Sequence, residues 1–306
     1  MKHSLFKLFA VIAILVAAIG CTRTVPLRVM SYNIRLGVAN DSLNHWELRK
    51  CATPAMLDEV RPAVFGVQEA YDFQVRYILD KCPKFKAIGV GRDDGVNAGE
   101  HMSVFYDTTR ITLRDWGTYW LSETPEVPSI GWDAACMRTA TWALLHDSQN
   151  GLDFYFVNTH LDHIGKIARR EGLALIYNRI KEMNPKGLPM VLTGDFNVLP
   201  DDEGLTDLNS LMLSARFNSN QADSIGSFNG FGAYGESHSA PVLEDGEADR
   251  NSLRPLDYIY YSGFCKSLLF KVDTTTYVGV PFISDHYPVY ADLVFNRLYL
   301  FHSRLI

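Results

Sequence analysis

The sequence has few cysteines, and none of them stand at the spacing of a metal-binding motif. Cys21 follows an apolar N-terminal stretch, while Cys51, Cys82, Cys136 and Cys265 are far apart and form no CxxC pair. A zinc ribbon needs closely spaced cysteine pairs, so this class of protein is excluded. Whether any two of the cysteines form a disulfide is left open by their number and spacing.

Clusters of basic residues are also missing. The chain carries 29 Lys and Arg against 35 Asp and Glu, and Arg169-Arg170 is the adjacent basic pair that stands out. Proteins that bind duplex DNA gather Lys and Arg on one surface to neutralise phosphates. Charge therefore does not favour duplex DNA as the partner.

The chain lacks internal repeats, low-complexity segments and any Pro/Gly/Ser-rich linker. It is 47% apolar and 21% charged, which is the balance of a globular protein rather than a disordered one. We therefore predict one domain over residues 26–295. Residues 296–306 form a C-terminal tail whose role the sequence does not indicate.

The N-terminal segment is typical of an export signal. Lys2 and Lys7 precede an apolar stretch from Leu8 to Ile19 that is too short to span a bilayer comfortably. Residues 18–21, Ala-Ile-Gly-Cys, resemble a bacterial lipobox. We expect a lipoprotein signal peptide over residues 1–20 and a lipidated Cys21 that anchors an exported protein to a bacterial membrane, facing the periplasm. The alternative is an ordinary signal peptide with an incidental cysteine. Cleavage would leave 27 basic against 35 acidic residues, a net charge of −8.

The rest of the chain alternates between strand and helix signals. Short runs rich in Val, Phe, Tyr and Ile predict strands within residues 27–36, 63–70, 102–107, 140–146, 152–161, 188–198, 255–262 and 287–295. Helices are expected over 163–183, where apolar residues follow a 3.6-residue period, over 71–80, and within 46–60, where Pro54 either kinks the helix or starts its ordered part. Residues 230–251 are interpreted as a long polar excursion. Eight strands with flanking helices predict an α/β sandwich.

Polar side chains follow several of these apolar strands at the point where each strand ends. Burying such groups costs several kcal/mol unless they are paired, hydrogen-bonded or bound to a ligand, so we expect them to share one site. The residues concerned are Asn33, Glu69, His160, Asp195, Asn197 and Asp257, followed by the adjacent pair Asp285 and His286. Carboxylates with few nitrogen ligands and no cysteine suit Mg²⁺ or Mn²⁺ better than Zn²⁺.

Six of these segments, taken in order, resemble one family. "SYNIRL", "FGVQEA", "VNTHLDH", "TGDFNVLP", "LDYIYYS" and "SDHYPV" are similar to motifs of the endonuclease/exonuclease/phosphatase superfamily and span roughly residues 30 to 290. The resemblance implies a DNase I-like, four-layered α/β sandwich of two packed mixed sheets flanked by helices. It also implies a metal site, in which Glu69 is the principal ligand, Asn33 lies beside it, and Asp285 binds directly or through water.

The resemblance further implies a catalytic set. His286 resembles the catalytic histidine, oriented by Asp257, and a histidine with an ordinary pKa near 6.5 would be a fitting base. Asp195 and Asn197 resemble the pair that positions the attacking water and binds the phosphoryl oxygens. His160 resembles the histidine that donates to the phosphate or the leaving group.

Two further segments resemble the borders of the cleft in exported bacterial members. "GRDDGVNAGEHM" offers Arg92, and "GWDAACMRTATW" offers Arg138, as residues that bind the substrate. The plain alternatives are a solvated loop and a surface arginine.

These residues predict a metal-dependent phosphoesterase, which hydrolyses phosphodiesters or phosphomonoesters as a monomer. Its expected substrates are a phosphorylated small molecule, a lipid head group or single-stranded nucleic acid. One alternative is a deadenylase-like or DNase I-like nuclease, and a second is a non-catalytic binding module on the same fold. A sphingomyelinase-like toxin is disfavoured because residues 230–251 are too polar for a membrane-inserting hairpin.

Overall fold

A computed structural model describes residues 25–235, 254–262 and 265–295. The predicted signal peptide with Cys21, most of the polar excursion at 230–251 and the tail at 296–306 lie outside the described residues. Within the described ranges, no helix has the length and apolar character needed to cross a membrane.

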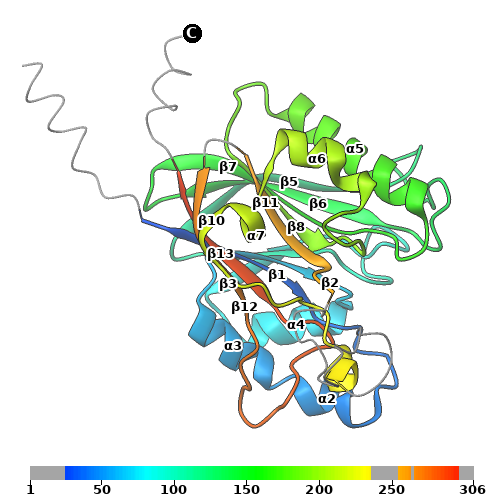
Figure 1. Cartoon of the computed structure of the whole chain (residues 1–306), viewed down its shortest axis with the longest axis vertical. Coiled ribbons are helices and arrows are strands. Elements are labelled where there is room, and N and C mark those ends of the chain that lie inside the picture. Colours follow the sequence, from blue (N-terminus) through cyan, green and yellow to red (C-terminus); the bar gives the residue numbers. More distant parts are fainter. Residues whose placement is uncertain (1–24, 236–253, 263–264, 296–306) are drawn as a thin grey trace, which may run out of the picture.

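The strands form two sheets (Figure 1). The first sheet has seven strands in the order β10-β12-β13-β1-β2-β4-β3. Their bounds are Ser219–Ala222, Cys265–Val272, Val289–Phe295, Leu27–Asn33, Val64–Gln68, Val104–Asp107 and Phe85–Ile88. The second sheet has six strands in the order β5-β6-β7-β8-β11-β9. Their bounds are Ile111–Trp120, Thr139–Asp147, Leu152–His160, Met190–Asp195, Asp257–Tyr261 and Leu213–Ser214.

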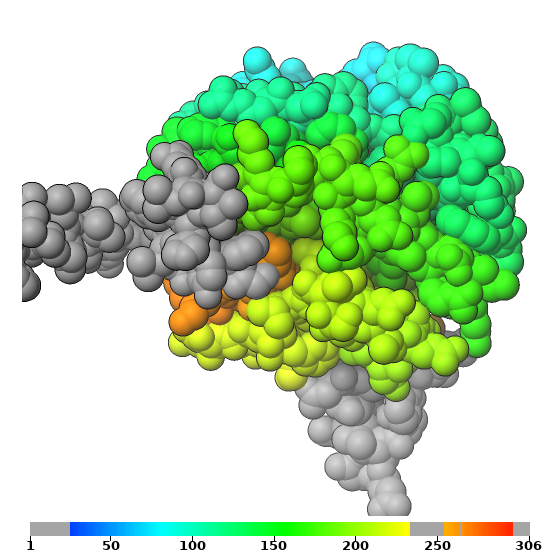
Figure 2. Space-filling view, turned by 90° about the horizontal axis from the view of Figure 1, so that it is seen from above, coloured from blue at the N-terminus to red at the C-terminus, as the bar shows by residue number. Residues whose placement is uncertain are grey.

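Helices cover the outer faces of both sheets (Figure 1). The bounds of α2 to α7 are Trp46–Arg49, Ala52–Val60, Asp72–Lys81, Lys166–Met183, Thr206–Leu211 and Ala215–Asn218, and short 3₁₀ helices span Ser42–Asn44, Glu203–Leu205 and Gly230–Gly235. Helices α2 to α4 pack on the first sheet, where Met56 and Ile78 join Phe65 in one apolar cluster. Helices α5 and α6 pack on the second sheet, where Ile176 and Leu208 join a similar cluster. These two helices lie on the face of the molecule shown in Figure 2.

The inner faces of the two sheets form the third and largest apolar layer. Val29, Val64 and Val289 from the first sheet are packed with Phe154 and Phe156 from the second, and all five are fully buried. Helix, sheet, sheet and helix together give the four-layered α/β sandwich that the sequence predicts.

Strand direction brings the predicted site residues to one rim. Strands β1 and β2 are parallel, as are β7 and β8, so their C-terminal ends meet at one edge of the sandwich. Strand β11 runs antiparallel to β8, and β13 runs antiparallel to β1, which places the starts of β11 and β13 at the same edge. Six chain segments therefore converge there.

A polar contact joins the two sheets directly beneath this rim. The side chain of Asn158 on β7 donates to the carbonyl of Val67 at 2.7 Å, and its Oδ1 accepts from Gln68 Nε2 at 2.6 Å. Asn158 fits because residue 66 on β2 is glycine, where a Cβ atom would come within 2.2 Å of the amide. This buried pair fixes β2 against β7 close to the rim.

The structure also differs from the predicted elements in places. All eight predicted strands are present among the described residues, but β3, β5, β9, β10 and β12 were not predicted. The helix expected within 46–60 is two helices, with Pro54 in the first turn of the second. Strand β5 was missed because Arg114, Asp115 and Trp116 in its middle are all exposed, which hides the alternation typical of a strand. The four described cysteines are all free thiols.

Candidate active site

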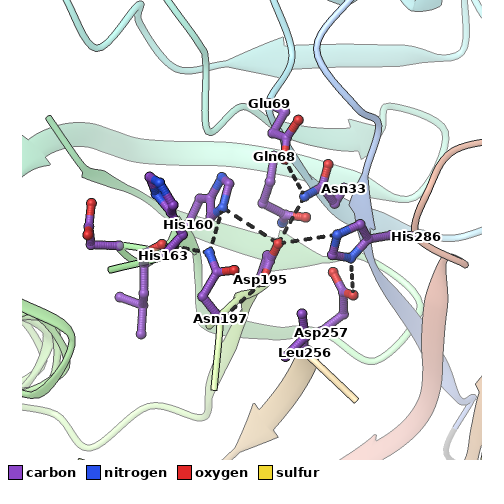
Figure 3. Close-up of polar contacts among 12 residues, drawn as sticks. Asn33, Gln68, Glu69, His160, His163, Asp195, Asn197, Leu256, Asp257 and His286 are labelled. Atoms are coloured by element: carbon purple, nitrogen blue, oxygen red, sulfur yellow. Dashed lines mark hydrogen bonds and ion pairs between the residues drawn. The ribbon is translucent and has the colours of Figure 1, made fainter. Parts of the chain in front are cut away.

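Asp195 lies at the centre of the rim. The side chains arranged around it in Figure 3 include Asn33, Glu69, His160, Asn197, Asp257 and His286. It ends β8 and is almost completely buried. Its Oδ2 accepts a hydrogen bond from Asn33 Nδ2 at 2.9 Å, and its Oδ1 accepts from the backbone N–H of Asn197 at 3.0 Å. Burial raises the pKa of Asp195 to about 7, and the charge of Asp257 adds to this, although His286 opposes it.

On one side of Asp195 lies His286. Its Nδ1 is 2.7 Å from Asp257 Oδ2, and its Nε2 is 3.7 Å from Asp195 Oδ2. Burial alone would lower the pKa of this imidazole, but the charges of Asp257 and Asp195 and the hydrogen bond to Asp257 raise it to about 10. The neighbouring carboxylates therefore favour the charged form of His286 in this arrangement.

On the other side of Asp195 lies His160, which ends β7. Its Nε2 is 3.5 Å from Asp195 Oδ2 and 3.0 Å from the side-chain nitrogen of Asn197. Because that amide donates, Nε2 is an acceptor and the ring proton is on Nδ1, a buried atom with no hydrogen-bond partner among the described residues. Burial, and then the charges of Arg138 and Arg92, hold the pKa of His160 well below its usual value.

The expected metal ligands lie at the ends of β1 and β2 and ahead of β13. Glu69 Oε1 accepts from Asn33 Nδ2 at 3.0 Å, so one amide joins Glu69 to Asp195. Asp285 is nearly buried, and burial followed by the charge of Glu69 raises its pKa, although His286 and Arg35 oppose this. The guanidinium of Arg35 lies 3.8 Å from Glu69 and 3.7 Å from Asp285, so both carboxylates converge on a positive charge.

This set of donors fits a divalent cation. Ligand atoms of Glu69, His160 and Asp195 lie within 4.8 Å of one another, as do those of Asp195, Asp257 and His286. Most of these atoms are carboxylate oxygens, the ligands that Mg²⁺ and Mn²⁺ prefer. A divalent cation would offset the repulsion between these buried carboxylates.

The two predicted substrate-binding arginines lie on the His160 side. Arg92 is held by Glu100, with one nitrogen 2.8 Å from each carboxylate oxygen. Arg138 is 5% exposed, with its Nε 3.3 Å from Asp162 and one Nη 2.9 Å from His163 Nδ1. The charges of both arginines contribute to the lowered pKa of His160. In contrast, Asp94 and Asp133 from the same motifs accept backbone N–H bonds within their own loops and at the start of α5.

The backbone at the rim is unusual. Glu69 and Asn197 have φ angles of 62° and 54°, and Arg35 has 58°, all in the left-handed region that non-glycine residues rarely adopt. Such strain of about 1–3 kcal/mol per residue persists where the surrounding contacts over-determine it. At Glu69 those contacts are the hydrogen bonds from Asn33 and from the Leu36 backbone to its carboxylate.

Sequence reasoning missed three charged residues of the site. Glu100 clamps Arg92, Asp162 binds Arg138, and Arg35 contacts Glu69 and Asp285. Each stands inside a motif that was recognised, respectively "GRDDGVNAGEHM", "VNTHLDH" and "SYNIRL". Each of the three is a charged residue within the same motif as a predicted site residue. A single sequence does not indicate which charged residues of a motif point into the site.

Comparison with known proteins identifies the family to which this fold and site belong. The model of the endonuclease/exonuclease/phosphatase family matches residues 30–286. The chain belongs to this family. A family protein from Bacteroides thetaiotaomicron is 33% identical, with a TM-score of 0.80, over 89% of this chain and 99% of that one. A mannosyl-6-phosphatase from the same organism is 34% identical, with a TM-score of 0.79, over 88% and 100% of the two chains.

The fold is also similar to that of a solved structure with lower sequence identity. The catalytic domain of human Nocturnin, solved with a bound sulfate anion, is 19% identical, with a TM-score of 0.63, and 88% of this chain and 93% of that domain are covered. At this identity the likeness concerns the fold alone. The chain is therefore a family member with a DNase I-like fold and an acid and histidine cluster that could bind a divalent metal.

Proposed function

We propose that this chain is a divalent-metal-dependent phosphoesterase that releases phosphate from a small phosphorylated molecule, with a sugar phosphate as the favoured class. The observation that carries the proposal is the placement of Asp195 between His160 and His286, with Glu69 joined to it through Asn33. The 34% identity to a mannosyl-6-phosphatase supports the substrate class. The acidic net charge of the chain gives no general attraction to nucleic acid.

The cation would be Mg²⁺ or Mn²⁺, held by Glu69 and Asp285 with Asn33 beside them. When bound, it supplies positive charge to the phosphate oxygens and offsets their repulsion of an incoming nucleophile. All other roles in the proposal fall to side chains of this chain.

Asp195 is the proposed proton acceptor for the attacking water. Its pKa of about 7 suits proton transfer near neutral pH. The geometry fixes its carboxylate from both ends, through Asn33 and the backbone of Asn197. A preorganised acceptor needs no reorientation at the moment of reaction. This role differs from the expectation that His286 would be the base.

His286 and the two arginines would bind the phosphoryl oxygens. Asp257 holds the imidazole through Nδ1, which leaves Nε2 directed toward Asp195 and free to donate to a phosphate oxygen beside it. Arg92 and Arg138 are held by Glu100 and Asp162 near His160. A phosphomonoester dianion, with more negative charge than a diester, fits this concentration of fixed cations.

A phosphate-release assay over a substrate panel tests the proposal. The panel contains hexose phosphates, glycerol phosphate, a phospholipid head group and a short single-stranded oligonucleotide, each with Mg²⁺ or Mn²⁺. We expect release from the sugar phosphates and a loss of at least about 100-fold in Glu69→Ala and His286→Ala. Glu47→Ala and His146→Ala, which alter side chains outside the site, are the matched controls. Cleavage of the oligonucleotide alone would favour the nuclease alternative, and no turnover of any substrate would favour the binding module.

We also propose that the protein is exported and anchored by lipid on Cys21. The apolar stretch from Leu8 to Ile19 and the lipobox-like sequence that follows support this. Cells grown with labelled palmitate should incorporate the label into the wild type but not into Cys21→Ala. The variant should move from the membrane fraction to the soluble fraction. Label in the variant, or a wild type that is soluble, contradicts the anchor.

A further inference from the structure

Arg35 lies beside Glu69 and Asp285, the two carboxylates that would hold the cation. The sequence predicts no role for Arg35. It follows the end of β1 by two residues. Its guanidinium is 3.8 Å from Glu69 Oε2 and 3.7 Å from Asp285 Oδ2. A third carboxylate, Asp41, binds it with two hydrogen bonds of 3.0 Å each. One fixed positive charge therefore faces three acids.

Backbone contacts keep Arg35 in this position. Its N–H donates to Asn33 Oδ1 at 3.0 Å, and its carbonyl accepts from Arg49 at 3.1 Å and from Gln74 at 3.0 Å. With φ at 58° and both backbone groups bonded, the residue has little freedom to turn away. The clamp by Asp41 removes most of the remaining side-chain freedom. A guanidinium is protonated throughout the physiological pH range, so the charge of Arg35 is permanent.

Electrostatics gives this position a consequence for metal binding. Two carboxylates carry a charge of −2, which one divalent cation already balances, so little negative charge is left for a second cation. Arg35 also balances part of the charge of Glu69 and Asp285. A second cation among the same oxygens would also be repelled by the guanidinium a few ångströms away. The side chain of Arg35 is only 29% exposed, so solvent screens this repulsion incompletely.

We infer that Arg35 acts as a built-in second cation, which restricts the site to one divalent ion and weakens the binding of that ion. The inference rests on the proposed metal site and adds its stoichiometry and the residue that sets it. Asp41 is then a positioning residue for Arg35 rather than a metal ligand. Beside Glu69 and Asp285, the protein would then hold one divalent ion and the guanidinium of Arg35 in place of two divalent ions.

Titration of the metal-free full chain with Mn²⁺, followed by calorimetry and by the electron paramagnetic resonance of free Mn²⁺, tests the inference. We expect one Mn²⁺ per wild-type chain. In Arg35→Gln the first ion should bind about tenfold more tightly, because a nearby like charge is gone. Arg35→Lys keeps the charge and should bind one ion with nearly wild-type affinity. Circular dichroism checks that each variant is folded.

Arg28 provides a matched control at the other end of the same strand. It forms the same two-bond clamp with Asp292, at 2.7 Å for each bond, and its side chain is 31% exposed. Arg28→Gln should therefore leave Mn²⁺ binding unchanged. Two ions per wild-type chain, or equal affinities in Arg35→Gln and Arg28→Gln, overturn the inference and leave the proposed function intact. If the wild type binds no Mn²⁺, the proposed metal site fails together with the inference.

Discussion

The two histidines on either side of Asp195 have similar burial, but their pKa values are shifted in opposite directions. His286 is 4% exposed and His160 is 5% exposed, and each has its Nε2 within 3.7 Å of the same carboxylate oxygen. His286 faces Asp257 and Asp195, which raise its pKa to about 10, whereas burial and two arginines lower the pKa of His160. Neighbouring charges, and not burial, distinguish them.

In the proposed function, this contrast would divide the binding of a phosphate between two kinds of cation. On the β11 and β13 side, Asp257 and Asp195 favour the charged form of His286. On the β7 side, the arginines would supply the charge directly, while burial and these arginines favour the neutral form of His160, whose Nε2 accepts a hydrogen bond from Asn197. A neutral His160 would suffice on the β7 side, because Arg92 and Arg138 would supply the positive charge there. Glu100 and Asp162 hold these two arginines in place. Each half can be altered separately.

The largest expected effect comes from Asp257→Asn. The amide cannot support a charged imidazole at Nδ1, so the pKa of His286 should fall and the cationic half of the site should be lost. We expect kcat to fall by about 10²–10⁴-fold. Nitrogen-15 NMR titration of the imidazole, together with saturation kinetics, measures both consequences.

A surface pair supplies the control for Asp257→Asn. Asp153 lies 2.6 Å from His146 Nδ1, the same type of contact, but on exposed parts of β6 and β7. Asp153→Asn should keep full activity. Equal activity in Asp153→Asn and Asp257→Asn would show that the His286 contact has no catalytic importance.

Arg138→Met tests the other half. Removing the guanidinium should raise KM by about 10–100-fold, because a charge-assisted contact to phosphate is worth about 1.5–3 kcal/mol. The pKa of His160 should rise, since Arg138 holds it down. Arg110→Met is the control, because Arg110 binds Asp147 at the opposite end of β6. A fall in kcat at constant KM would contradict the binding role.

Much of the fold could be predicted because strand composition and strand ends are local properties. The segments before Asn33, His160 and Asp195 are short, apolar and bounded by polar residues, and each is a strand in the structure. Strand β12 was missed because Lys266 and Lys271 lie among its apolar residues. Sheet order was not predictable, because pairings such as β1 with β13 join residues far apart in the chain.

The site was predictable in membership but not in charge. Family-like motifs identified Asp195, His160 and His286, and the structure brings all three together. The pKa shifts of the histidines depend on Asp257, at the start of β11, and on Arg138, which precedes β6, so only the folded arrangement indicates that the two pKa values move in opposite directions.

The opposite shifts predict opposite effects of pH on the stability of the metal-free protein. The pKa of His286 is raised when folded, so its contribution is complete below about 6.5 and is lost as pH rises through about 10. The pKa of His160 is lowered, so stability falls as pH drops below about 6.5, where the unfolded chain gains a proton that the folded chain does not. Each slope is at most about 1.4 kcal/mol per pH unit.

Urea unfolding at several pH values, with a chelator present, separates the two histidines. His286→Gln should flatten the alkaline side of the stability profile, and His160→Gln should flatten the acid side. Flattening of the same side by both substitutions would show that the two imidazoles share one charge state. The surface substitution His146→Gln provides the baseline for both comparisons.

The smallest effect is expected from Glu100→Gln, which weakens the contact that holds Arg92 but keeps Arg92 itself. It tests whether the His160 side of the site can be changed without affecting His286. The amide keeps the shape of Glu100 but accepts only one of the two guanidinium hydrogen bonds, each 2.8 Å long in the native site. Arg92 should then sample other orientations, and KM should rise about fivefold with little change in kcat. Glu123→Gln, on an exposed loop, is the control, and Glu100→Asp should restore part of the affinity.

The titration of His286 should be the same in Glu100→Gln and in the wild type, because Asp257 and Asp195 are the carboxylates that raise its pKa. A shifted His286 titration would mean that the two halves of the site are coupled rather than independent.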